Sequence, residues 1–196
     1  MENKVFQTIQ KRKSCRNFSN KSVSKESLEK IIEAGQYAPS GGNSKIGKIM
    51  VITDKELQNQ IEKIVENEFS KMTIESGMYK SIVSSIKQSK KGGYHFSYQP
   101  NVFVIVLNKK DYVNAMADSV CIVENMMLEA TELEIGSCYI NQLHWLTDNE
   151  KVRDFLKPLG LEDDEHIYAG LSLGYPNEEK FFERSRKIKN NVVLYY

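Results

Sequence analysis

The stretch VFVIVL, residues Val102 to Leu107, decides the fold, because an unbroken apolar run of this length favours a buried strand. Such a strand is covered on both faces, so it belongs at the centre of a sheet. Further strands are predicted at Lys48–Thr53 (KIMVIT), Cys138–Ile140 and Tyr168–Leu173. The tail Val192–Tyr196 is also β-prone and has no partner strand nearby in sequence. We expect the tail to pair with a distant strand, in this chain or in another.

Apolar residues at helical spacing separate the predicted strands. The segment Met72–Lys91 is less regular, with helical character around Ile82 and a break at Gly92-Gly93. Strands surrounded by helices give an α+β fold. The other predicted helices are a short one through Val5 and Ile9, Ser24–Ala38 before Pro39, one capped by Asp54, Tyr112–Leu133 closed by Gly136, and one opened by the capping-box pattern Thr147–Glu150.

Length and composition indicate one ordinary globular domain over residues 1–196. The chain is 40% hydrophobic and 27% charged, and its formal net charge of +1 gives no reason to expect nucleic acid or an anionic membrane as a partner. No apolar run reaches the ~18 residues of a membrane span, and residues 1–13 lack the apolar stretch of a signal peptide. Three widely spaced cysteines (Cys15, Cys121 and Cys138) favour a reducing compartment, so we expect a cytoplasmic protein.

Several common chemistries have no support in the sequence. There is no G-x-G-x-x-G, no G-x-x-x-x-G-K-[ST] and no G-x-S-x-G. His95, His144 and His166 lie far apart and form no metal-ligand spacing with the cysteines, so no metal site is predicted. No acid, base or nucleophile constellation stands out, and we name no catalytic residue. This pattern suits an enzyme whose chemistry is supplied by a cofactor such as a flavin.

Arg12, Ser14 and Arg16 form the first informative cluster. Alternate residues of an extended segment point to one side, so two guanidiniums and a hydroxyl would face one ligand. That set suits a phosphate monoester, because hydrogen bonds to charged groups contribute about 1.5–3 kcal/mol each. The alternative is a solvated basic face at a helix end, or a contact with an acidic partner.

Pro39, Ser40 and Asn43 belong to a second cluster, Ala38–Ser44. One interpretation is a helix terminator followed by a flexible turn. The other is a ligand-binding loop, in which glycines let the backbone approach a planar ligand and Asn43 supplies an amide donor and acceptor. This segment alone leaves both interpretations open.

Taken together and in order, the clusters resemble the nitroreductase family of FMN enzymes. Arg12–Phe18 matches the family pattern R-R-S-x-R-x-F, and Ala38–Asn43 matches A-P-S-x-x-N. Glu132–Ile140 is similar to the family's E-x-G-[IL]-G-S-C-W-I. The segment Gly170–Pro176 (G-x-x-x-G-Y-P) and the basic Arg184–Lys187 follow at the expected places. The resemblance extends over nearly the whole chain.

The resemblance implies a central, mainly antiparallel sheet flanked by helices, in a homodimer that exchanges its C-terminal strand. It also implies an FMN site that combines residues of both subunits. Arg12, Ser14 and Arg16 would hold the phosphate and ribityl end, and the partner would supply the loop cluster. The complete set of implied FMN-binding residues is Arg12, Ser14, Arg16, Pro39, Ser40, Asn43, the backbone around Tyr139, Ile140 and Asn141 beside the ring, and Arg184 or Arg186 from the C-terminal side.

The activity implied is that of an NAD(P)H-dependent FMN oxidoreductase. Hydride from NAD(P)H would pass to the flavin and then reduce a nitroaromatic, quinone or similar acceptor by a ping-pong shuttle. Alternatives are a flavin-fragmenting or dehalogenating enzyme of the same fold, or a flavin-binding module without turnover. The sequence does not choose between NADH and NADPH or identify the acceptor.

Two segments depart from the family pattern. Ser44–Lys48 replaces the usual Gln-Pro-aromatic stretch, and we expect Lys45 to point to solvent. Phe69–Tyr98 aligns with no family motif, although relatives often shape the substrate pocket there. Tyr79, Tyr94, His95 and Phe96 are candidates to line such a pocket, with burial in the core as the alternative.

Overall fold

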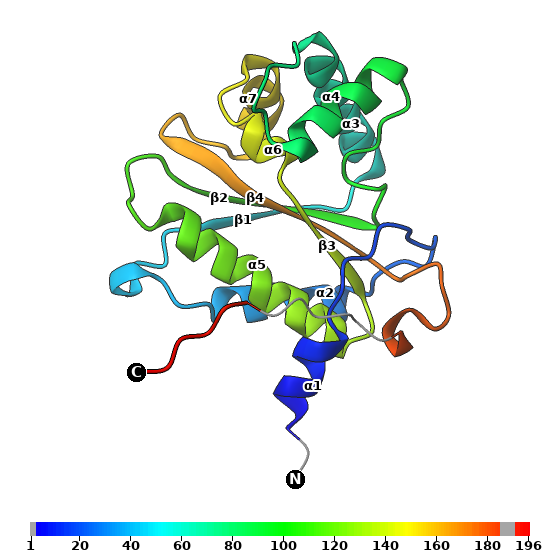
Figure 1. Ribbon diagram of the computed structural model, residues 1–196, viewed down its shortest axis with the longest axis vertical. Helices are drawn as coiled ribbons and strands as arrows, with labels where there is room; N and C mark the ends of the chain where they lie inside the picture. The colour runs from blue at the N-terminus through cyan, green and yellow to red at the C-terminus, as the bar shows by residue number, and fades with distance from the viewer. Residues whose placement is uncertain (1–2, 185–190) are drawn as a thin grey trace.

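The computed structural model describes residues 3–184 and 191–196 and has a four-stranded sheet with helices on both faces (Figure 1). The strand order is β1-β2-β4-β3, and every neighbouring pair is antiparallel. The predicted α+β fold with an antiparallel sheet is therefore confirmed. The strands are β1 (Lys48–Ile52), β2 (Val102–Lys109), β3 (Gly136–Ile140) and β4 (Glu165–Gly174). The α-helices are α1 (Lys4–Lys11), α2 (Lys25–Gln36), α3 (Lys55–Lys71), α4 (Lys80–Lys91), α5 (Ala115–Glu132), α6 (Gln142–Trp145) and α7 (Glu150–Leu156), and short 3-10 turns are η1 (Gly41–Asn43), η2 (Lys157–Leu159) and η3 (Phe181–Glu183).

Strand β2 joins the two halves of the core. Phe103, Ile105 and Leu107 pack into a cluster with residues of α3, α4, α6 and α7. Val102, Val104 and Val106 face the opposite way and pack with residues of α2 and α5. Figure 1 shows these two groups of helices on opposite sides of the sheet. The prediction that VFVIVL is buried on both faces is confirmed.

Two helix starts follow the sequence closely, whereas a third does not. Ser24 accepts a hydrogen bond from the N–H of Ser27, and Asp54 accepts one from Leu57, as expected of N-caps. The predicted capping box at Thr147 is wrong, because Asn149 caps α7 by accepting from the N–H of Val152 at 3.2 Å. The Thr147 hydroxyl instead accepts from the N–H of Ile167 in β4.

The long helix α5 is shorter at both ends than its pattern predicts, running from Ala115 to Glu132. The prediction that Gly136 closes it is wrong. Glu134 takes the left-handed conformation, with φ of 56°, and the N–H of Ile135 donates to the carbonyl of Ala130 at 2.7 Å. Gly136 is thereby released to begin β3.

The segment that aligns with no family motif forms the end of α3 and all of α4. Helix α4 begins at Lys80 and ends at Gly92, whose φ of 82° suits glycine and confirms the predicted break. Helices α3 and α4 pack against each other above the sheet (Figure 1). Helix α4 contributes Ser81, Ser84, Ser85 and Gln88 to one wall of the candidate site.

The tail residues Val192–Tyr196 are exposed and form no strand within the described chain. Exchange of this tail with another chain stays a prediction. None of the helices in the described part of the chain combines the length and the apolar character of a membrane span.

Candidate functional site

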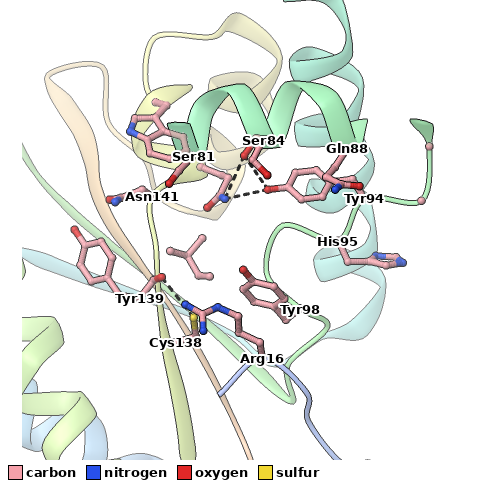
Figure 2. Close-up of a pocket in the computed structure, with 16 residues that line it drawn as sticks. Arg16, Ser81, Ser84, Gln88, Tyr94, His95, Tyr98, Cys138, Tyr139 and Asn141 are labelled. Carbon is pink, nitrogen blue, oxygen red and sulfur yellow. Dashed lines mark hydrogen bonds between the residues drawn. The ribbon is translucent and has the colours of Figure 1, made fainter. Parts of the chain in front are cut away.

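A cavity of about 480 Å³ lies between the end of β3 and helix α4 (Figure 2). We call the side that carries Arg16, Tyr98 and residues 138–141 the floor, and the side formed by α4, Tyr94 and Gln142 the roof. Figure 2 shows Ser84, Gln88 and Tyr94 opposite Arg16, Cys138 and Tyr139. The lining residues are Arg16, Ser81, Ser84, Ser85, Gln88, Gly92, Gly93, Tyr94, His95, Tyr98, Cys138, Tyr139, Ile140, Asn141, Gln142 and Trp145.

The N-terminal segment reaches this cavity by docking on the edge strand β3. Ser14 forms a parallel bridge with Ser137, and the N–H of Cys15 donates to the Ser137 carbonyl at 2.8 Å. The buried Cys15 side chain lies over Gly136, where an added Cβ would come within 2.7 Å of the Cys15 Cβ. Glycine is therefore needed at 136 for the segment to approach. The next residue, Arg16, then lines the cavity floor.

Arg12, Ser14 and Arg16 converge on the thiol of Cys138. Burial raises the pKa of this thiol, and the charge of Arg16, a hydrogen bond with Ser14 and the charge of Arg12 each act to lower it. All three side chains thus act on one buried group, and Arg16 is the one of them that lines the cavity. Arg12 also forms an ion pair with Glu124 of α5 at 3.6 Å.

A strained loop holds Tyr98 beside Arg16. Tyr98 and Gln99 both have left-handed backbones, with φ of 64° and 52°, which is unfavourable for residues with a side chain. The Arg16 guanidinium lies 5.8 Å from the centre of the Tyr98 ring. Tyr98 was not among the predicted site residues, because no local pattern indicates its conformation.

Two carboxylates of α3 hold this loop in place by accepting hydrogen bonds from it. The buried Glu62 accepts hydrogen bonds from the N–H of Ser97 at 3.1 Å and from its hydroxyl, and lies 2.7 Å from Nδ1 of His95. Glu66 accepts from the N–H of Tyr94 at 2.7 Å. Sequence reasoning missed Glu62, although a carboxylate beside the apolar positions of a helix is a signal that could have found it.

The C-terminal end of the described chain also lies beside the N-terminal segment. Lys13 donates to the carbonyls of Phe181 and Arg184, at 2.6 and 2.7 Å. Arg184 is thus brought near the basic cluster, while its side chain pairs with Glu178. Arg186, the other predicted C-terminal contact, lies outside the described residues. Lys13 was not predicted to have a role.

Pro39, Ser40 and Asn43 lie away from this cavity. Pro39 and Ser40 line a separate hollow of about 380 Å³ beside α5, and Asn43 belongs to η1. Figure 1 shows η1 near the start of α5, whereas the N-terminal segment contacts α5 toward its end. Among the described residues, a single chain therefore brings Arg16 and residues 139–141 together in this cavity.

Lys45, in the same loop, does not simply point to solvent as expected. Its ammonium group donates to the carbonyls of Gln36 and Ala38, at 3.2 and 2.6 Å. These carbonyls follow the last turn of α2, where a cation is favourable. Lys45 thus caps a helix end.

The four aromatic candidates of the unaligned segment divide between cavity and core. Tyr94 and His95 line the cavity. Phe96 is fully buried and packs edge-to-face on Phe103 of β2. Tyr79 is 63% exposed and lies against Trp145 outside the lining.

The cavity joins Arg16 to the end of the edge strand β3 in an antiparallel α+β domain. Comparison with known proteins gives the family. A model of the nitroreductase family matches residues 9–175, and the chain belongs to this family.

Two solved structures and one curated relative illustrate the similarity. The chain is 30% identical to a Bacteroides fragilis nitroreductase crystallised with bound FMN, with a TM-score of 0.82 over 98% of this chain and 96% of the other. A Desulfitobacterium hafniense nitroreductase with bound FMN has 24% identity and a TM-score of 0.82 over the full length of both chains. The NADPH-flavin oxidoreductase of Vibrio harveyi is 24% identical over 197 residues, which cover 98% of this chain and 73% of the relative.

The loop anchor gives a prediction for stability. Glu62→Ala removes the acceptor of the buried Ser97 N–H, so the free energy of unfolding should fall by about 1–3 kcal/mol. Glu62→Gln retains an acceptor oxygen and should cost less. Lys63→Ala, an exposed change one residue away on the same helix, is the control. Urea unfolding followed by circular dichroism measures all three, and equal midpoints for Glu62→Ala and Lys63→Ala would contradict the assignment.

Proposed function

We propose that the chain is an NAD(P)H-dependent FMN oxidoreductase that reduces a nitroaromatic, quinone or similar acceptor. The observation that carries the proposal is the docking of the N-terminal segment on β3, which brings Arg16 to the floor of the cavity. The FMN-bound nitroreductase from B. fragilis and the flavin oxidoreductase from V. harveyi support the same activity. The free thiols of Cys15, Cys121 and Cys138 support a reducing, cytoplasmic location.

The residues present fit FMN. Two guanidiniums and a hydroxyl form a donor set suited to a phosphate monoester. Arg184 lies close to them in space, since its carbonyl accepts from Lys13, and its side chain would join them. Pro39, Ser40 and Asn43 would complete the site from a partner subunit, since they lie away from the cavity of their own chain.

The end of β3 offers main-chain groups to the flavin ring. Strand β3 is an edge strand, paired only with β4 on its inner side. The Ser137 carbonyl faces outward, since it accepts from Cys15. Main-chain groups alternate along a strand, so those of Tyr139 face outward too. Beyond the Ser14 bridge they would face a ligand bound beside Ile140 and Asn141.

When bound, FMN supplies the redox chemistry, taking hydride from NAD(P)H and passing two electrons to the acceptor in a ping-pong cycle. The protein's residues bind and orient. Arg16, held beside Tyr98 by the anchored loop, places a positive charge at the cavity floor and would offset negative charge on the cofactor. No side chain is required as a nucleophile.

We also propose that the functional unit is a homodimer that exchanges the tail Val192–Tyr196. Large apolar side chains are exposed on α1 and α5 as well as on the tail, and clustered exposed apolar surface marks interaction sites. The tail would pair with a strand edge of the neighbour. The exposed residues are Val5, Phe6, Ile9, Met116, Val120, Val192, Val193, Leu194, Tyr195 and Tyr196.

The activity predicts a visible reaction. The purified protein should be yellow, and anaerobic NADH or NADPH should bleach its flavin absorption. With the acceptor varied at several NAD(P)H concentrations, double-reciprocal plots should be parallel, because the two substrates never occupy the enzyme together. Intersecting lines would count against the shuttle. Flavin that stays oxidised would indicate a binding module, and strict oxygen dependence or halide release would indicate one of the related enzymes.

The phosphate assignment predicts the effect of removing the guanidiniums. Arg12→Ala with Arg16→Ala should weaken FMN binding by at least about 10-fold, since each charge-assisted hydrogen bond contributes about 1.5–3 kcal/mol. Lys25→Ala with Lys30→Ala removes two cations from the exposed face of α2 and is the matched control. Flavin fluorescence during dialysis measures retention. Full retention in the double arginine variant would refute the assignment.

The dimer proposal predicts the effect of truncation. A chain ending at Asn191 lacks the apolar tail and should dissociate at protein concentrations where the full chain is dimeric. Sedimentation velocity over a dilution series measures the difference. As control, replacement of the exposed Val113 by Thr leaves the tail intact and should leave the dimer unchanged. Equal dissociation constants for the truncated and full chains would exclude tail exchange as a dimer contact.

A further inference from the structure

The roof of the cavity is a polar surface that the proposed cofactor contacts do not use. Ser81, Ser84, Ser85 and Gln88 follow one another at helical spacing, so α4 directs one polar face to the cavity. Tyr94 and Gln142 continue this surface. Figure 2 shows the roof separated from Arg16 and Tyr139 by the open cavity. The floor carries the groups proposed for FMN, which leaves the roof to the second substrate.

Three roof side chains form a closed hydrogen-bond cluster. The Ser85 hydroxyl lies 2.9 Å from the Tyr94 hydroxyl. The Gln142 amide nitrogen donates to the Tyr94 oxygen at 3.0 Å and to the Ser85 oxygen at 3.4 Å. The amide thus gives both of its protons to the hydroxyl pair, and the pair shares one hydrogen bond between its members. Of the pair's two protons, one remains for another acceptor.

The protonation of the pair is fixed. Burial raises the pKa of Tyr94 above its ordinary value, although Ser85 and Gln142 act to lower it. The phenol therefore stays neutral and protonated at physiological pH. Among the described lining residues there is no carboxylate, so nothing acidic in the lining competes for the remaining proton.

We propose that the Ser85–Tyr94 hydroxyl pair, oriented by Gln142, donates a hydrogen bond to an oxygen atom of the electron acceptor. The inference rests on the proposed function and assigns the groups that recognise the nitro or carbonyl oxygen of its acceptor. A simple aryl halide such as iodobenzene has no such oxygen and would leave the donor unsatisfied.

The test compares binding of two ring compounds to the oxidised, FMN-loaded protein without NAD(P)H. Nitrobenzene carries the oxygen acceptor and iodobenzene does not, and the shift of the flavin spectrum gives each Kd. In the Ser85→Ala, Tyr94→Phe double variant, the Kd of nitrobenzene should rise about 2- to 12-fold, the value of one neutral hydrogen bond. The Kd of iodobenzene should stay unchanged. The control Ser70→Ala, Tyr79→Phe also removes one serine and one tyrosine hydroxyl, but outside the cavity.

An unchanged Kd of nitrobenzene would overturn the inference. An equal rise in the Kd of both compounds would also overturn it, because it would indicate that the substitutions changed the shape of the cavity. If the double variant fails to load FMN, Gln142→Glu gives the same test, because a carboxylate there accepts both hydroxyl protons and leaves none for the ligand. The Gln142→Glu variant should raise the Kd of nitrobenzene and leave that of iodobenzene unchanged. An unchanged Kd of nitrobenzene would overturn the inference. Bleaching of the wild-type flavin by NAD(P)H tests the proposed function separately.

Discussion

The site depends on the close approach of the N-terminal segment to the edge strand β3. Gly136 makes the approach sterically possible, and Cys15 fills the space that a side chain at 136 would take. The main-chain bond from Cys15 to Ser137 then fixes the register, so Arg16 arrives at the cavity floor. An unattached basic arm would lose about 1–2 kcal/mol of conformational entropy per residue on binding a ligand. Because the segment docks on β3 when the chain folds, this entropy is lost during folding and not on ligand binding.

The central strand separates two tasks. Strand β2 is buried on both faces because a layer of helices covers each face of the sheet. One layer borders the cavity, and the other lies on the opposite face of the sheet. The cavity layer contains α4 and the anchored loop. The other layer contains α2 and α5, beside the loop that holds Pro39 and Ser40. The two predicted clusters therefore lie apart in one chain, and the proposed two-fold partner would bring them together.

Much of the fold and the first half of the site could be predicted from local sequence. The strand Val102–Leu107, the N-caps Ser24 and Asp54 and the alternation of Arg12, Ser14 and Arg16 all depend on residues close together in the chain. Long-range partners could not be predicted in this way. Lys13 contacts the carbonyl of a residue 171 positions away, and Glu62 holds residues 33 and 35 positions away. Gly136 was misplaced because Glu134 takes the positive φ that usually indicates glycine.

The residues of the cavity floor can be predicted from sequence motifs, whereas those of the roof cannot. The floor is proposed to bind a cofactor of fixed chemistry, so its residue types and order follow family motifs. The roof needs only donors in the right places, which serine, tyrosine and glutamine can supply in many arrangements. This explains why Phe69–Tyr98 aligns with no motif and yet contributes Ser85 and Tyr94 to the cavity. In the proposed site the acceptor would be selected by the hydrogen bonds that α4 and its following loop leave unsatisfied, and those become visible only when the partners of each hydroxyl are counted.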